Sequence, residues 1–206
     1  MKRIITILLS LFRQIIHFAG FRKYRIRVTV QKKKKNQSPR QLEQQQKFTL
    51  ISQLISPMLP FLPLTYAHVF GSMDPCDKAF AFNIRNAITG TYPKCRIDFD
   101  AVKVSRGQLY NSHTADSYYA SGKIHFSWRN LKINNASDND ISVLVVYCPI
   151  KKKCIYDLNG SIRMEEKAKL DVSEFKGHVV HSYLSFMAAN GLMNSDSKYT
   201  GRHIIN

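Results

Sequence analysis

Two pairs of side chains have a spacing that would suit metal binding or acid–base chemistry. His178 and His181 lie three residues apart, but on an extended strand this spacing places them on opposite faces, so we do not expect a shared zinc ion. Asp98 and Asp100 would share one face of a strand, where they could act as paired carboxylates or as calcium ligands. Solubility of an edge strand is the more common reason for such a pair, and we favour it here.

The sequence gives no support to nucleophilic catalysis. Ser127, His125 and Asp140 have no spacing that distinguishes a catalytic triad from chance, and Cys95 has no identifiable base. The phosphate-binding P-loop, the G-x-G-x-x-G and G-x-S-x-G turns and the H-E-x-x-H zinc motif are absent from the sequence. We therefore expect no catalytic residues, no metal and no cofactor, and predict that the protein is not an enzyme.

The strongest chemical signal is positive charge near the start of the sequence. The 206 residues contain 31 Lys and Arg against 14 Asp and Glu, and residues 1–47 hold 13 of the basic side chains with a single acid, Glu43. Such a segment can replace counterions along a phosphate backbone without reading base sequence, although a solvated tail that only aids solubility has the same composition. The polyanion would be nucleic acid or an acidic protein surface. The residues predicted to bind it are Arg22, Lys23, Arg25, Arg27, Lys32, Lys33, Lys34 and Lys35.

Residues 2–18 have the pattern of an amphipathic helix. At about 100° per residue, the apolar side chains between Ile4 and Phe18 fall on one arc, and the polar ones fall on the other. Three interpretations stay open: a helix that packs on an apolar face of the same protein, a helix that lies on a membrane surface, and a cleaved secretion signal. The apolar run is too short for a transmembrane helix.

The sequence after this segment predicts helices followed by strands. Ser38, Pro39 and Gln41 have the spacing of a capping box, which predicts a helix from residue 38 to about Ile55. A second helix is expected from Asp74 to Gly90. From Tyr92 onward the apolar period changes to two, as in β-strands. We predict seven strands, near residues 95–104, 122–129, 141–149, 153–158, 166–172, 178–189 and 197–204, a number typical of a β-sandwich.

Tyrosines are concentrated in residues 105–121, which we predict to be a long connection between strands. Tyr110, Tyr118 and Tyr119 lie there together with His113. Exposed tyrosines on a loop offer contact area to a partner at low entropic cost, and packing of the loop against the sandwich is the other interpretation.

The four cysteines lack the spacing of a zinc site or of a disulfide-rich scaffold. Cys148 and Cys154 flank a short loop and could face each other across a hairpin, where a disulfide is sterically possible. Four reduced, unreactive thiols are the interpretation that we favour.

Several segments resemble known families. Residues 122–128, 143–149 and 183–191 resemble the B, C and F strands of fibronectin type III domains. Residues 38–48, 54–57, 83–93 and 156–160 resemble the signature of an uncharacterised Bacteroidota domain-of-unknown-function family, over about residues 36–204. The family implies a helical front part joined to an immunoglobulin-like sandwich, and no established activity. Members usually show a Gly-rich opening, from which the first 20 residues depart.

These observations together define the expected protein. The fold class is α+β, mainly β, with two N-terminal helices and a seven-stranded antiparallel sandwich of immunoglobulin or fibronectin type III type. The expected domains are an amphipathic helix with a basic arm (1–37), a helical region (38–91) and the sandwich (92–206). We expect a non-enzymatic interaction or structural protein whose basic arm binds a polyanion. The alternative is an envelope-associated or secreted module that residues 2–18 hold at a membrane surface. The sequence does not fix the oligomeric state or the compartment, although a cytoplasmic location is slightly favoured.

Overall fold

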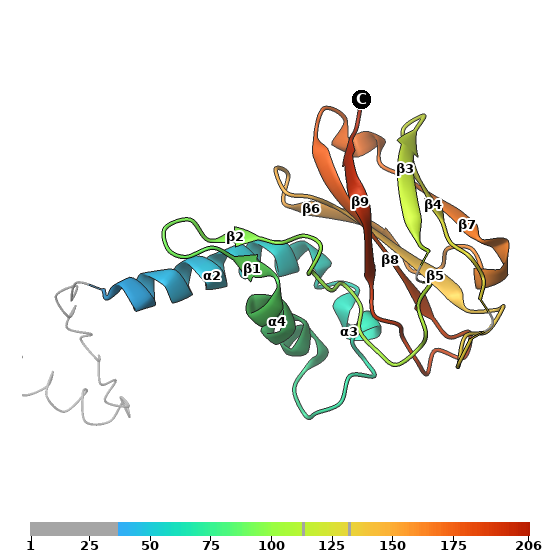
Figure 1. Cartoon of the computed structure of the whole chain (residues 1–206), viewed down its shortest axis with the longest axis horizontal. Helices are drawn as coiled ribbons and strands as arrows, with labels where there is room; N and C mark the ends of the chain where they lie inside the picture. Colours follow the sequence, from blue (N-terminus) through green and yellow to red (C-terminus); the bar gives the residue numbers. More distant parts are fainter. Residues whose placement is uncertain (1–36, 113, 132) are drawn as a thin grey trace, which may run out of the picture. The chain divides into compact units, whose positions relative to one another are not determined.

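Helix α2 (Pro39–Ile55) begins and ends where the sequence predicts. The computed structural model describes residues 37–206 apart from residues 113 and 132 (Figure 1). The Ser38 hydroxyl accepts a hydrogen bond from the Gln41 amide (3.3 Å), and the Gln41 side chain accepts one from the Ser38 amide (2.9 Å). This reciprocal capping box satisfies two amide groups that a helix N-terminus otherwise leaves unpaired.

Three prolines follow α2 and limit the chain to short turns. The 3₁₀ helix η1 (Ser56–Met58) and helix α3 (Leu62–Thr65) each have a proline in their first turn, where no amide donor is needed. Helix α4 (Pro75–Asn86) is the predicted second helix, and the Asp74 carboxylate caps it by accepting a hydrogen bond from the Cys76 amide at 2.8 Å. None of the described helices is long and apolar enough to cross a membrane.

All strand pairs within the sheets are antiparallel, and the strands form three sheets (Figure 1). The smallest sheet is the pair β1 (Ile88–Thr89) and β2 (Arg96–Ile97). A three-stranded sheet has the order β3-β4-β7, with bounds Asp116–Ala120, Lys123–Ser127 and Lys167–Asp171. A four-stranded sheet has the order β6-β5-β8-β9, with bounds Lys153–Asp157, Ile141–Cys148, Val179–Met187 and Lys198–Ile204. The 3₁₀ turns η2 (Arg163–Glu165) and η3 (Ser173–Phe175) flank β7.

The four-stranded sheet is buried on both faces. Leu144 and Val146 of β5 belong to a core that contains Phe126 of the three-stranded sheet. Val143 and Val145 belong to a second core, which includes α2, η1 and α3. Because alternate residues of a strand face opposite sides, the continuous apolar run of β5 is what a strand between two cores requires. The helical region thus covers one face of this sheet, and residues 37–206 form one unit.

Six predicted strands are confirmed, and the prediction near residues 95–104 is wrong. There the strand β2 contains only Arg96 and Ile97, because the Asp98 carboxylate accepts a hydrogen bond from the Asp100 amide (3.2 Å) and turns the backbone. Asp98 and Asp100 therefore do not share a strand face. The long connection predicted for residues 105–121 is also wrong at its end, since β3 begins at Asp116.

The missed strand β3 is joined to β4 by a two-residue turn. Ser121 and Gly122 have φ values of 50° and 76°, which are typical of the type I′ turn of a tight β-hairpin. A Ser-Gly pair between two β-rich runs is a hairpin signal, and it predicts β3 once the turn is recognised.

All four cysteines are free thiols. In the hairpin of β5 and β6, Cys148 pairs with Lys153, and Cys154 pairs with Tyr147. Their side chains therefore point to opposite faces, with Cys148 in one core and Cys154 against the other. The two cysteines do not face each other, so the disulfide that the sequence left open is not formed.

Candidate functional site

The described part of the chain contains three groups of polar side chains with chemical interest: a buried ion pair, a serine–histidine cluster and the outer face of the three-stranded sheet. Each can be judged by whether its groups are still accessible to a ligand. The first two use their polar atoms within the fold, and the third leaves them exposed.

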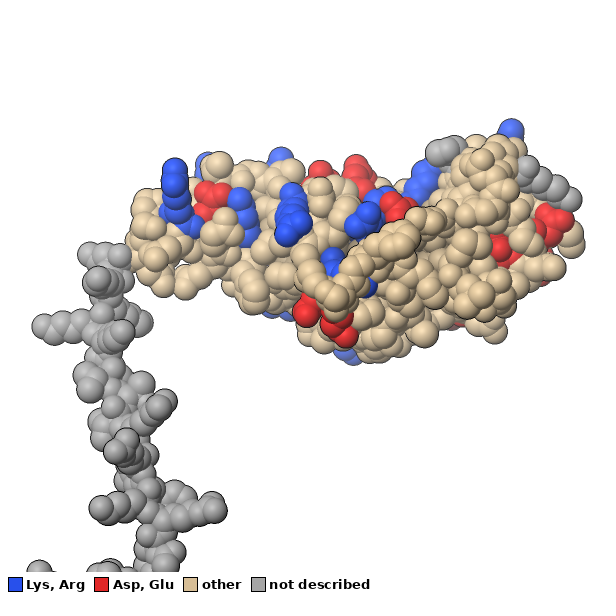
Figure 2. Space-filling view, turned by 90° about the horizontal axis from the view of Figure 1, so that it is seen from below, with Lys and Arg blue, Asp and Glu red and all other residues tan. Residues whose placement is uncertain are grey.

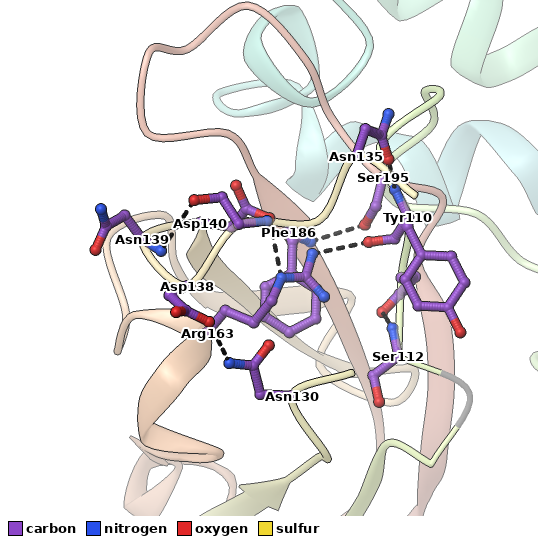
Figure 3. Close-up of polar contacts among 12 residues, drawn as sticks. Tyr110, Ser112, Asn130, Asn135, Asp138, Asn139, Asp140, Arg163, Phe186 and Ser195 are labelled. Atoms are coloured by element: carbon purple, nitrogen blue, oxygen red, sulfur yellow. Dashed lines mark hydrogen bonds and ion pairs between the residues drawn. The ribbon is translucent and has the colours of Figure 1, made fainter. Parts of the chain in front are cut away.

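Arg163 lies in the core and is completely buried (Figure 3). Its Nε donates to the Asp140 carboxylate at 2.9 Å, and its Nη2 donates to the Tyr110 carbonyl at 2.7 Å. The guanidinium carbon lies 3.7 Å from the centroid of the Phe186 ring, and the Trp128 indole donates to the Arg163 carbonyl at 2.8 Å. Burial lowers the pKa of Arg163, and the Asp140 carboxylate acts against this shift.

This ion pair is structural in its geometry. Asp140 is only 1% exposed and faces Arg163, so it does not complete a triad with His125 and Ser127. Those two residues are on β4, on the outer face of the three-stranded sheet. Asp140 is therefore kept apart from His125 and Ser127, and the three side chains do not form a triad.

A second cluster joins the edges of the two larger sheets. Ser117 of β3 meets Nε2 of His203 at 2.8 Å and the Ser182 hydroxyl at 2.9 Å, and Ser182 also meets Nε2 of His203, at 3.0 Å. Thr200 donates to Ser182 at 2.9 Å. A side chain at Gly201 would place its Cβ only 3.1 Å from Nε2 of His203, so glycine at this position leaves room for the His203 ring.

The serine–histidine pair does not have the arrangement of a nucleophile with its base. One nitrogen of His203 is shared between two hydroxyls from different sheets, which makes the cluster a link between strands β3, β8 and β9. Burial lowers the pKa of His203, and Asp116 opposes this shift. The sequence analysis missed this cluster because Ser117 is 65 or more residues away from Ser182 and His203. Ser182 and His203 are closer in sequence, on β8 and β9.

The outer face of the three-stranded sheet carries an aromatic pair beside lysines. In the register of the sheet, Tyr118 of β3 pairs with His125 of β4, which pairs with Lys169 of β7. The rings of Tyr118 and His125 are stacked, with centroids 4.9 Å apart and planes at 7°. Tyr118 is 58% exposed, so one aromatic surface of the stack is open to solvent.

A hollow of about 420 Å³ lies on this face. Its lining includes Tyr118, His125, Lys167, Lys169 and Glu165. The last three side chains belong to exposed residues. We call this hollow and its lining the sheet-face site. It combines an open aromatic surface with two ammonium groups and one carboxylate, a set that can bind a ligand.

The tyrosines that the sequence singled out have different roles. Tyr118 lines the sheet-face site, whereas Tyr119 points the other way, packs against the core and donates to the carbonyl of Asn206 at 2.8 Å. The carbonyl of Tyr110 accepts from Arg163. Lys167 and Lys169 were missed as site residues, although their alternation with Ala168 and Leu170 in a predicted strand places both on one face.

The other predicted positions stay apart. His181 of β8 stacks on Phe99 with ring centroids 3.6 Å apart, and its Nδ1 meets the Tyr199 hydroxyl at 3.0 Å, while His178 precedes the strand. Burial lowers the pKa of His181 to about 4. Within residues 37–206, apart from 113 and 132, no three His, Cys, Asp or Glu side chains are placed to hold a metal ion. The predicted polyanion-binding residues 22–35 and the predicted helix 2–18 lie outside the described residues.

Comparison with known proteins gives a family and no activity. No curated protein and no solved structure gives a match to the chain. The model of one family, described as a family of unknown function (DUF6266), matches residues 16–201. This match includes the helical front part, the three-stranded sheet with the sheet-face site, and the four-stranded sheet up to residue 201 of β9. It confirms the predicted membership of a domain-of-unknown-function family. The chain belongs to this family of unknown function, DUF6266.

Proposed function

We propose that this protein is a non-enzymatic binding protein that docks on a polyanion through basic residues 22–35. The observation that carries the proposal is the distribution of charge: residues 1–47 hold 13 basic side chains and one acid, whereas residues 48–206 hold 18 and 13. A cationic segment of this density gains affinity for a phosphate backbone by releasing condensed counterions. Nucleic acid is therefore the polyanion that we propose.

The surface charge of the described residues supports a stronger attraction of the polyanion by the basic segment than by the rest of the protein. On the face shown in Figure 2, Lys and Arg side chains are interspersed with Asp and Glu side chains. A surface of mixed sign attracts a polyanion less strongly than a run such as Lys32 to Lys35. The basic segment would therefore supply most of the electrostatic attraction.

The body itself we infer to be an immunoglobulin-like sandwich of fibronectin type III type. Its sheets contain three and four antiparallel strands, and one core includes side chains from both. Strands β4, β5 and β8 fall at the segments that resemble strands B, C and F. Sandwiches of this kind are common scaffolds of binding proteins, although fold alone does not define function.

The polar clusters support a role in binding rather than catalysis. Arg163 and Asp140 are sealed in the core, and Ser117, Ser182 and His203 bond to one another across strands. Most polar atoms of these two clusters bond to other groups of the protein, so the clusters stabilise the fold.

The test compares two triple substitutions of the full chain that remove the same charge. Lys33, Lys34 and Lys35→Gln change the basic segment. Lys151, Lys152 and Lys153→Gln change two exposed residues of the loop between β5 and β6 and the exposed first residue of β6. Binding of a fluorescein-labelled DNA duplex is measured by anisotropy at low salt. We expect the first variant to bind at least tenfold more weakly than the unmodified chain, and the second to stay within about threefold.

Two outcomes would contradict the proposal. If the two variants lose the same affinity, total charge and not the basic segment drives binding. If the unmodified chain binds neither the duplex nor a single strand at low salt, nucleic acid is not its polyanion, and poly-glutamate measured in the same way then tests an acidic protein surface.

A further inference from the structure

We infer that the sheet-face site takes a base of single-stranded nucleic acid, with flanking phosphates on its lysines. This inference rests on the proposed function, because it identifies the class of polyanion and a second place of contact. It adds a surface that binds a base, within the described residues, to the basic segment, which would contact only the phosphate backbone of the nucleic acid.

The aromatic pair supplies the stacking surface. Tyr118 and His125 come from directly opposed positions of neighbouring strands, so the sheet backbone holds both rings in place. Their planes differ by only 7°, and Tyr118 is 58% exposed, which leaves a flat aromatic surface for a further ring. Bases stack on such side chains in proteins that bind single strands, and the contact tolerates every base because each has a π-face.

The charged side chains around the rings have distinct tasks. Lys167 and Lys169 belong to the same outer face of β7, where exposed ammonium groups can meet the phosphates on either side of a stacked base. Glu165 would repel a phosphate placed against it. Its carboxylate instead accepts hydrogen bonds, and cytosine, adenine and guanine carry amino groups that donate them.

The geometry favours a single strand over the other polyanions. A hollow of about 420 Å³ has the volume of a small ligand site, and bases inside a duplex have no free face to offer to Tyr118. An acidic peptide would use the lysines, but it would meet Glu165 and gain nothing from the stacked rings. Only a chain that carries both phosphates and unstacked rings uses every group of the site.

The experiment measures anisotropy of two labelled 12-nucleotide single strands with the full chain. One strand contains bases, and the other has abasic sites at all internal positions and the same phosphates. Tyr118→Ala is compared with Phe70→Ala, which removes a ring that is 84% exposed elsewhere on the body. We expect Tyr118→Ala to weaken binding of the base-containing strand about tenfold and to leave the abasic strand within about twofold.

The controls separate failure of this inference from failure of the proposed function. Equal affinity of the unmodified chain for both strands would overturn the base site and leave the basic segment as the polyanion site. If the unmodified chain binds neither single strand and does not bind a duplex, both the base site and the proposed function are wrong. Phe70→Ala is expected to change neither affinity, and His125→Ala to reproduce the loss of Tyr118→Ala. Thermal melting of each variant shows whether the fold is retained.

Discussion

At the scale of single residues, the guanidinium of Arg163 is a charged group that lies completely buried in the core. A charge in a core is tolerated only when its partners replace the lost hydration. Asp140 and the Tyr110 carbonyl supply two of these partners, and the Phe186 ring supplies a third contact through its π-face. The pair also ties η2 to the segment that precedes β5.

The substitution Asp140→Asn keeps the shape of the side chain and removes its charge. It leaves the buried cation of Arg163 uncompensated, so we expect the free energy of unfolding to fall by about 3 to 5 kcal/mol. Urea unfolding monitored by fluorescence of Trp128, which contacts Phe186, measures this change.

The double substitution Arg163→Met with Asp140→Leu serves as the comparison. Because it removes both charges, it should cost less than Asp140→Asn alone. A loss below about 1 kcal/mol for Asp140→Asn, or a larger loss for the double variant, would contradict this account of the ion pair.

At the scale of elements, two histidines hold strands together in their neutral form. The ring of His181, on β8, stacks on the ring of Phe99 in the turn after β2. The ring of His203 links β9 to β3 and β8. Burial lowers both pKa values, that of His181 to about 4 from its ordinary value of 6.5. Protonation of either ring therefore opposes folding.

The pH dependence of stability follows from these shifts. Since the unfolded chain takes up protons near pH 6.5 and the folded chain does not, the contribution is fully present above that pH and is lost as the pH falls towards 4. For His181 the loss amounts to at most about 3 kcal/mol. Chemical denaturation between pH 7 and pH 4 is expected to show it, and His181→Phe to remove part of it. A stability that rises as the pH falls would contradict the shifts.

The sequence predicts elements well where a local signal exists. The helix at Ser38 and Pro39 is defined by its own capping box, and the strand β5 by a continuous apolar run. The strand expected near residues 95–104 fails because an Asx turn at Asp98 competes with pairing. The strand β3 was missed because the Ser121–Gly122 turn that ends it was not recognised as a hairpin signal.

The candidate site was predicted only in part. Tyr118 was singled out as a candidate binding residue, with packing as the other interpretation. Its stacking on His125 depends on the pairing of β3 with β4, which no single segment encodes. Lys169 joins them only through the pairing of β4 with β7, more than 40 residues along the chain. Contacts that depend on register between distant strands require the tertiary structure.

At the scale of the whole molecule, most of the net positive charge and the described core are in different parts of the sequence. The helices and the three-stranded sheet pack on opposite faces of the four-stranded sheet. Of the two larger sheets, the three-stranded one has an outer face, on β3, β4 and β7, with exposed side chains and a hollow. The proposals therefore combine a basic segment that binds the phosphate backbone of a nucleic acid with one exposed sheet face that binds a base.

The salt dependence of duplex binding tests the central claim most directly. If about five side chains of residues 22–35 contact phosphates, log affinity of the full chain should fall against log salt concentration with a slope of about −4.5. With Lys33, Lys34 and Lys35→Gln, the slope should become shallower, near about −2. An affinity that does not change with salt, or the same slope for both proteins, would contradict the claim that the basic segment binds the polyanion.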